Sequence, residues 1–358
     1  MKRKKPQSVL QQPKLSEDDH RDSKEVEKMN YLEKFYKVQL WEEVPAETLV
    51  IFRVLWGLIM CYETYTYIAG GYGKLLYIVD LKIHFPYYGF EWIKPLPGNG
   101  MYILLWLMVA ASLGISIGFY YRICSFAFFV MFTFLFLQEM TLYLNHFYLI
   151  CLISFLFTFL DLGDCYSVDS LFKKEKKYTL PYWNLWILKT LIFIVYTYAG
   201  LAKVNEDWLR GEPLLHWLPK RKNIYIFGKL LEYPWTAIMF SYCGLLLDMF
   251  IAPALYVPYL RPLGFIALIF FHSMNKVIFN IGVFPWVMLA STIVFVDPSK
   301  IFLVKPLTSS HAIKKKQVQT EPNTTWALVT KEEAHYIVLS YLCVTSSIGS
   351  FETLDISG

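Results

Sequence analysis

Hydrophobic residues in this chain fall in long blocks, and polar residues are concentrated between the blocks. About 20 apolar residues are enough to cross the hydrocarbon core of a bilayer. The block at 98–121, for example, contains no charged side chain. The pattern predicts spans at roughly 47–69, 100–119, 122–138, 142–160, 185–203, 236–257, 262–281 and 283–297, with a ninth at 335–350. The predicted fold is therefore all-α: a polytopic transmembrane helical bundle of about 8–9 spans.

Composition agrees with this fold class. The 358 residues are 56% hydrophobic and 18% aromatic, which is more apolar than soluble domains usually are. Residues 1–44 form a polar tail that begins Met1-Lys2-Arg3-Lys4-Lys5 and is expected to be cytosolic and disordered. It shows no cleavable signal peptide. Residues 45–300 would be the membrane domain, 301–334 a polar cytosolic linker and 335–358 an incomplete last span.

The distribution of lysine and arginine predicts the orientation. With the N-terminus in the cytosol, Arg122, Arg261 and the basic runs at 173–177 and 314–316 all fall on the cytosolic side, as the positive-inside rule requires. The run Lys220-Arg221-Lys222 is the exception, in a longer lumenal loop. The net charge of +5 is thus explained by basic loops near lipid headgroups, and it gives no sign of nucleic-acid binding.

Five polar residues are predicted to share one depth near the lumenal leaflet. Asn145 and His146 open the fourth span, Lys203 closes the fifth, and His272 and Asn275 lie in the seventh. A lone lysine at a span end usually reaches the headgroups with its amine, and a lone histidine is usually a hydrogen-bonded core residue. Their common depth instead favours a shared site, because polar groups inside a membrane need a partner or a function. An amine held in a dry pocket would be a usable base.

Other kinds of chemistry have no motif here. The chain lacks a P-loop, a GxGxxG motif after a strand, an HExxH motif and a GxSxG motif. The six cysteines are scattered without metal-ligand spacing, so no metal is expected. An organic, lipid-soluble cofactor fits better. Asp248 in the sixth span either locks a helix pair or acts on a ligand, whereas Arg53 and Glu63 are interpreted as structural.

A series of short segments resembles a known family. The segments occur in the family's order and cover about residues 45–300: Phe52-Arg53-Val54-Leu55-Trp56-Gly57, Tyr120-Tyr121-Arg122-Ile123-Cys124, Asn145-His146-Phe147-Tyr148-Leu149, Tyr166-Ser167-Val168-Asp169, Pro181-Tyr182-Trp183-Asn184, Ala199-Gly200-Leu201-Ala202-Lys203 through Asp207-Trp208, Gly244-Leu245-Leu246-Leu247-Asp248, and Phe271-His272-Ser273-Met274-Asn275. Together they resemble the membrane part of the vitamin K-dependent γ-glutamyl carboxylase, within the wider HTTM family.

The resemblance implies a function. A peptidyl-glutamate 4-carboxylase is a carbon–carbon lyase that converts protein glutamate to γ-carboxyglutamate and couples this step to epoxidation of reduced vitamin K, the hydroquinone. The co-substrates are O2 and CO2, and the reaction uses no metal. The partners would be membrane lipid, vitamin K and glutamate-containing secretory proteins. The protein would be a multi-pass protein of the endoplasmic reticulum membrane, with its active site facing the lumen.

The resemblance also implies roles for individual residues. Lys203 matches the lysine that deprotonates the hydroquinone, and His146 is the second catalytic residue. Asn145 and His146 match residues that hydrogen-bond the cofactor oxygens. His272 and Asn275 match further cofactor-binding positions.

The chain also departs from the family pattern. Leu144 stands where the family often has an asparagine, and Glu139 where it has an aspartate. The chain ends at Gly358, so most of the family's lumenal domain, which captures protein substrates, is expected to be missing. Two alternatives to a carboxylase therefore stay open. One is a non-catalytic, quinone- or lipid-binding membrane protein of the HTTM type, and the other is an inactive short isoform.

Overall fold

The structure, a computed structural model, describes residues 30–70, 85–175, 177–224, 227–279 and 281–297. The predicted ninth span, the 301–334 linker and the 335–358 segment lie outside the described residues. Eight helices match the eight predicted spans to within a few residues at each end, and they confirm the all-α fold class: α3 (Glu47–Ala69), α5 (Gly100–Ile117), α6 (Tyr121–Leu137), α7 (Asn145–Phe157), α9 (Trp183–Leu201), α12 (Pro234–Tyr256), α13 (Arg261–Phe279) and α14 (Phe284–Thr292), which η5 (Ile293–Phe295) continues.

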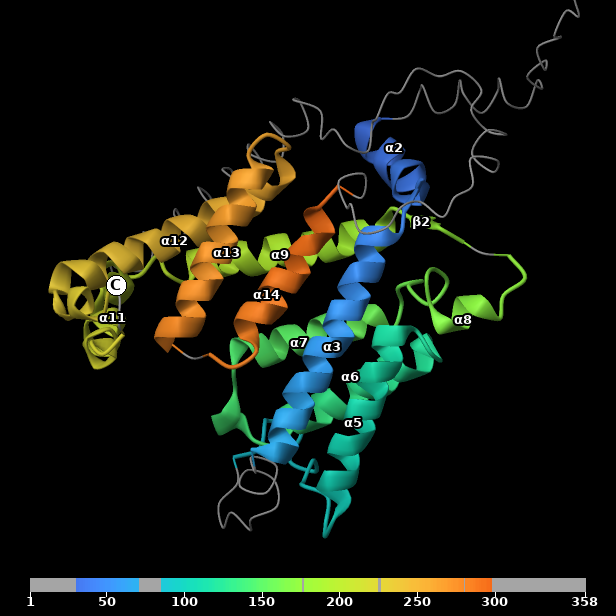
Figure 1. The fold of residues 1–358 in the computed structure, drawn as a ribbon, viewed down its shortest axis with the longest axis horizontal. Helices are drawn as coiled ribbons and strands as arrows, with labels where there is room; N and C mark the ends of the chain where they lie inside the picture. The colour runs from blue at the N-terminus through green and yellow to red at the C-terminus, as the bar shows by residue number, and fades with distance from the viewer. Residues whose placement is uncertain (1–29, 71–84, 176, 225–226, 280, 298–358) are drawn as a thin grey trace, which may run out of the picture.

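Five of these helices, α3, α5, α9, α12 and α13, are long and apolar enough to cross a membrane. The other three are shorter apolar helices. All eight helices pack as one bundle, in which α3 lies against α5, α9 lies against α12, and α14 contacts α3, α9 and α13 (Figure 1). Aromatic side chains fill the centre: the ring of Phe52 lies 5.4 Å from that of Phe157, and Trp56 is fully buried beside them.

Short elements connect the long helices. α2 (Tyr31–Lys37) and η1 (Gln39–Trp41) precede β1 (Glu43–Pro45), which pairs antiparallel with β2 (Thr179–Pro181). The remaining short elements are η2 (Met140–Leu142), α8 (Val168–Leu171), α10 (Glu206–Leu209), α11 (Glu212–Trp217), η3 (Pro219–Arg221) and η4 (Gly228–Glu232). The 204–235 segment thus contains a series of short helices.

Part of the predicted N-terminal tail is folded, which corrects the expectation of disorder for this stretch. The Asn30 side chain caps α2 by accepting a hydrogen bond from the Glu33 N–H at 2.9 Å. Lys37 then pairs with Glu33 one turn away at 2.7 Å. Helices gain from such caps and i,i+4 pairs, and a composition-based reading of a polar segment overlooks both.

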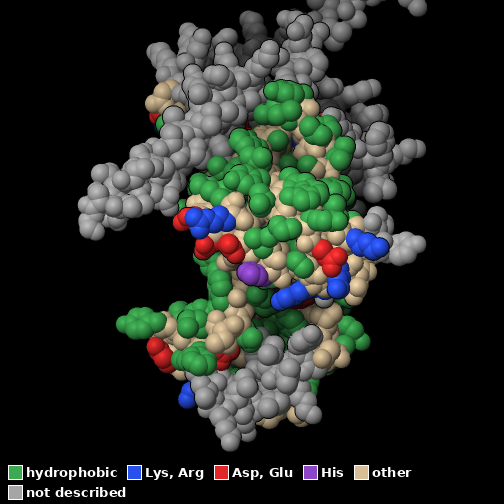
Figure 2. Space-filling model, turned by 90° about the vertical axis from the view of Figure 1, so that its left-hand side faces the viewer, with side chains coloured by type: hydrophobic (Ala, Val, Ile, Leu, Met, Phe, Trp, Pro, Cys, Tyr) green, Lys and Arg blue, Asp and Glu red, His purple; other side chains and the backbone are tan. Residues whose placement is uncertain are grey.

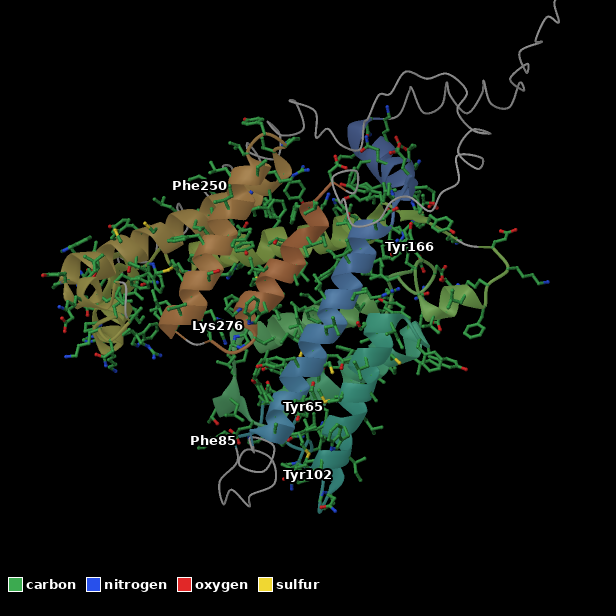
Figure 3. All side chains as sticks on the ribbon, viewed as in Figure 1. Tyr65, Phe85, Tyr102, Tyr166, Phe250 and Lys276 are labelled. Carbon is green, nitrogen blue, oxygen red and sulfur yellow. The ribbon has the colours of Figure 1, made fainter. Side chains whose placement is uncertain are left out.

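The bundle has two ends. We call the one that contains the start of α3 and the end of α7 the Arg53 end, and the opposite one, with the end of α9 and the start of α7, the Lys203 end. Figure 3 labels Tyr166 at the Arg53 end and Lys276 at the Lys203 end. The two ends hold different kinds of polar residues.

Arg53 organises the first end. It is 1% exposed, and its guanidinium donates hydrogen bonds to the backbone carbonyls of Leu162, Cys165 and Tyr166. It thereby ties α3 to the chain that leaves α7. We call Arg53 and its three carbonyl partners the Arg53 node. These three hydrogen bonds to backbone carbonyls agree with the interpretation of Arg53 as structural.

Asp169 completes this end by capping α6. Its two carboxylate oxygens accept the N–H groups of Tyr120 and Tyr121, each at 2.8 Å. The connection from α5 is tight because Gly118 takes a left-handed conformation, φ +69°, and a Cβ there would lie 2.4 Å from the Ser167 Cβ. Several of the segments that carry the family resemblance therefore build the fold.

Burial also raises the pKa of the Cys165 thiol, to about 12, so it stays protonated beside Arg53.

Candidate functional site

Lys203 lies just beyond the last turn of α9, but its side chain does not extend into bulk solvent. The Nζ atom donates to Asp248 Oδ2 at 2.6 Å and to the Ala199 carbonyl at 3.0 Å. The amine also lies 5.2 Å from the centre of the Trp208 ring. The side chain is only 19% exposed. Lys203 is therefore held inside the bundle, which contradicts the simple interpretation of a lysine whose amine reaches the headgroups.

The close approach of α9 and α12 makes this pair possible. Asp248 lies on α12 and is 4% exposed. Its neighbour Met249 packs directly on Gly200 of α9, where a Cβ would lie 2.6 Å from the Met249 Sδ. A larger residue at 200 would separate the two helices and the two charges. The Asp248–Lys203 bond therefore locks the helix pair, as one of the two interpretations of Asp248 proposed.

A second buried polar pair lies on the same face of α9. Tyr196 precedes Lys203 by seven residues, which is two helical turns. Its hydroxyl is 3.0 Å from the Nε2 atom of His272 on α13, and Asp248 interacts electrostatically with the same phenol. His272 is 1% exposed, and its Nδ1 atom has no hydrogen-bond partner within the described part of the chain. A buried polar atom without a partner is costly.

Phe284 at the start of α14 joins the two predicted histidines. Its ring centre lies 5.8 Å from that of His272 and 5.5 Å from that of His146. His146, in the first turn of α7, is 8% exposed. The structure thus brings His146, His272 and Tyr196 together, from three helices that are far apart in sequence.

The two predicted asparagines are less closely integrated. Asn145 is exposed at the start of α7, and Asn275 is half-buried one turn after His272. Within the described part of residues 30–297, the side-chain amides of Asn145 and Asn275 form no hydrogen bond. Both lie at the Lys203 end.

Figure 2 views the molecule from the side of α11 and α12 and shows charged side chains and a histidine around a hollow with hydrophobic side chains in its wall.

One more carboxyl is buried towards this end. Glu63 of α3 is 8% exposed, accepts a hydrogen bond from the Tyr67 hydroxyl at 2.9 Å, and interacts electrostatically with Lys276. Lys276 in turn donates to the Gly282 carbonyl at 3.2 Å. The hydrogen bond within α3 and the nearby Lys276 charge agree with the structural interpretation of Glu63. Within the described ranges, no group of three His, Cys, Asp or Glu side chains is placed to hold a metal ion.

The sequence did not identify two residues of this arrangement, or the partner of a third. Tyr196 and Phe284 are two among 26 tyrosines and 28 phenylalanines, and nothing in their local sequence distinguishes them. Asp248 was identified, but not as the direct partner of Lys203, 45 residues away. A charged residue inside an apolar span was the available signal, since such residues are rare and usually paired.

Comparison with known proteins identifies the family. No solved structure matches the chain. The HTTM domain matches residues 41–299, which include α3 to α14 and therefore every residue of the arrangement described above. The chain belongs to the HTTM domain family.

Proposed function

We propose that this protein is a vitamin K-dependent carboxylase: it binds reduced vitamin K at the Lys203 end and couples its epoxidation to γ-carboxylation of protein glutamate. The observation that carries the proposal is the buried polar series in which Lys203 pairs with Asp248 and His272 pairs with Tyr196. The HTTM domain is associated with the vitamin K-dependent carboxylase and related proteins, which supports the same function.

The residues present suit a flat ring that carries two oxygens. The His272 Nδ1 atom lacks a partner among the described residues and can exchange a hydrogen bond with a ligand oxygen. Phe284 contacts both histidines and offers an apolar ring face. When bound, reduced vitamin K supplies, on reaction with oxygen, a base strong enough to remove a glutamate γ-proton, which no side chain can do.

In this proposal the chain's own residues hold the ligand and move one proton. Lys203 Nζ is the base that takes a hydroxyl proton. His146, with Asn145, hydrogen-bonds one ligand oxygen, and His272, with Asn275, hydrogen-bonds the other. The apolar residues around them exclude water, which would otherwise quench a strong base.

The decisive experiment uses the full chain purified in lipid nanodiscs. Reduced vitamin K, oxygen and bicarbonate are added with and without a glutamate peptide, and both vitamin K epoxide and γ-carboxyglutamate are measured. The proposal expects epoxide and carboxylated peptide together. Epoxide without carboxylated peptide would indicate a core that lacks substrate capture. Binding of vitamin K without any epoxide would favour the alternative, a quinone-binding protein of the HTTM type.

Replacing His272 with phenylalanine tests the binding site separately. This change keeps the ring volume but removes Nδ1 and Nε2, so we expect vitamin K affinity to fall about 10- to 100-fold, the value of one or two buried hydrogen bonds. Quenching of tryptophan fluorescence in nanodiscs measures binding. His216→Phe, on exposed α11, is the matched control and should bind as wild type does. Unchanged affinity in His272→Phe would place the ligand elsewhere.

The proposed setting is the endoplasmic reticulum membrane, with the N-terminus in the cytosol and the Lys203 end facing the lumen. The proposed partners are membrane lipid and secretory proteins that present glutamates. Five helices long and apolar enough to cross a membrane support the membrane part of this assignment.

A further inference from the structure

The contacts of Lys203 create a chemical difficulty for its proposed role. An ammonium group has three hydrogens and no acceptor, and two of the three point to Asp248 Oδ2 and the Ala199 carbonyl. A base must have a free electron pair. Lys203 therefore has to give up one proton before, or while, it takes another.

Asp248 is the group placed to receive that proton. Its Oδ2 atom is 2.6 Å from Nζ, whereas the other acceptor of Nζ is a backbone carbonyl, which is a far weaker base. Asp248 is 4% exposed, so little water stabilises its charge. In such surroundings an ion pair loses much of its advantage over the neutral pair formed when the proton moves from nitrogen to oxygen.

We propose that Lys203 and Asp248 work as one proton-accepting unit, with Asp248 as the positioning residue that acts through Lys203. As Nζ accepts a proton from a ligand hydroxyl, one of its own protons passes to Asp248 Oδ2. One N–H bond forms and one breaks, an O–H bond breaks on the ligand and another forms on Asp248, and the ligand is left with the negative charge. This inference rests on the proposed function.

Other titratable groups surround the pair and must be separated from it. Tyr196 lies on the same face of α9 and is bonded to His272 on α13. Glu206 and Asp207, both exposed, follow Lys203 along the chain in α10. Asp248, in contrast to these three groups, contacts Lys203 Nζ directly.

The first test is the pH dependence of epoxide formation in Asp248→Asn, with the non-enzymatic rate subtracted at each pH. In the wild type the unit is ready while it holds one proton, so activity should be flat across the neutral range. In Asp248→Asn the amine must first lose a proton to solvent. We expect the rate near neutral pH to fall about 100-fold and then to recover about tenfold per pH unit in alkali.

Two variants serve as controls. Asp248→Glu keeps the carboxylate and should keep the flat profile at a lower rate. Asp161→Asn removes a carboxylate that pairs with Arg122 at the Arg53 end, far from the site, and should behave as wild type does. If Asp248 only holds α9 and α12 together, Asp248→Asn will lower the rate by the same factor at every pH, and that result overturns the inference.

A second test needs no vitamin K. Lys203 is labelled with an amine-specific acylating reagent in the unliganded protein, and modification of its peptide is followed by mass spectrometry. Because the amine must then lose its proton to solvent, Asp248→Asn should be labelled several-fold more slowly than wild type at neutral pH, whereas labelling at Lys276 should not change. Equal labelling of Lys203 in both proteins would contradict the proposal that Lys203 and Asp248 work as one proton-accepting unit.

The two proposals fail in distinguishable ways. A wild-type protein that forms no epoxide contradicts the proposed function and, with it, the role given to Asp248. A wild-type protein that forms epoxide, together with an Asp248→Asn variant of unchanged pH profile, contradicts only the role of Asp248.

Discussion

Replacing Lys203 with arginine is expected to reduce epoxide formation by about 100- to 10,000-fold, the usual contribution of a positioned base. Arginine keeps the positive charge next to Asp248, so the buried ion pair and the contact between α9 and α12 are retained. A guanidinium, however, does not lose its proton at any pH that the protein tolerates. The variant therefore separates the base function of Lys203 from its structural function. Epoxide is measured by chromatography of the extracted vitamin.

The matched control is Lys276→Arg. Lys276 is also at the Lys203 end and donates to the Gly282 carbonyl, a contact that arginine can replace. This variant should form epoxide at the wild-type rate. Lys203→Ala is a useful third protein, because it leaves Asp248 buried without its cation and should lower stability as well as activity. Wild-type epoxide formation by Lys203→Arg would exclude Lys203 as the base.

Replacing Arg53 with methionine is expected to destabilise the fold by at least about 3 kcal/mol, because each hydrogen bond from a charged donor to a buried acceptor contributes about 1.5–3 kcal/mol. The carbonyls of Leu162, Cys165 and Tyr166 would lose their donor in the interior. Methionine keeps the unbranched stem, so the change in packing is small. Denaturant unfolding in mixed micelles, followed by tryptophan fluorescence, measures the loss.

Arg122→Met provides the comparison at the same end of the bundle. Arg122 pairs with Asp161, but its side chain is 57% exposed. Exposed ion pairs contribute about 0–1 kcal/mol, so this variant should unfold almost as wild type does. For Arg53→Met we expect normal vitamin K affinity in the fraction that folds, since the Arg53 node is at the opposite end from Lys203. A stability loss of equal size in both variants would contradict the importance assigned to burial.

The hydrophobic pattern was sufficient to predict the eight apolar helices, five of which are long enough to cross a membrane, because a bilayer requires long apolar stretches. Their ends were less accurate. α7 begins at Asn145 and ends at Phe157, whereas the pattern predicted 142–160. The residues before Asn145 form η2, which Glu139 caps through the Thr141 N–H. The β1–β2 pair could not be predicted, since a three-residue strand has no periodicity of its own.

The candidate site was only partly predictable, for a physical reason. Polar residues in apolar helices are conspicuous in sequence, so Lys203, His146, His272 and Asp248 could all be identified. Their pairing depends on which helices pack together, and that is decided by features such as the contact of Gly200 with Met249. The hydrogen bond of Tyr196 and the position of Phe284 between two histidines follow from the same packing.

The Arg53 node has a consequence for how the chain is made. Its members lie between positions 53 and 166, and the Asp169 cap on α6 follows three residues later. Ribosomes release the chain from its N-terminus, and early segments can associate before later ones exist. Everything needed to tie α3 to the end of α7 has therefore been synthesised before Lys203 has been added. The first helices can form a platform in the membrane on which α9, α12, α13 and α14 then assemble the site, so changes at Arg53 should act on biogenesis rather than on turnover.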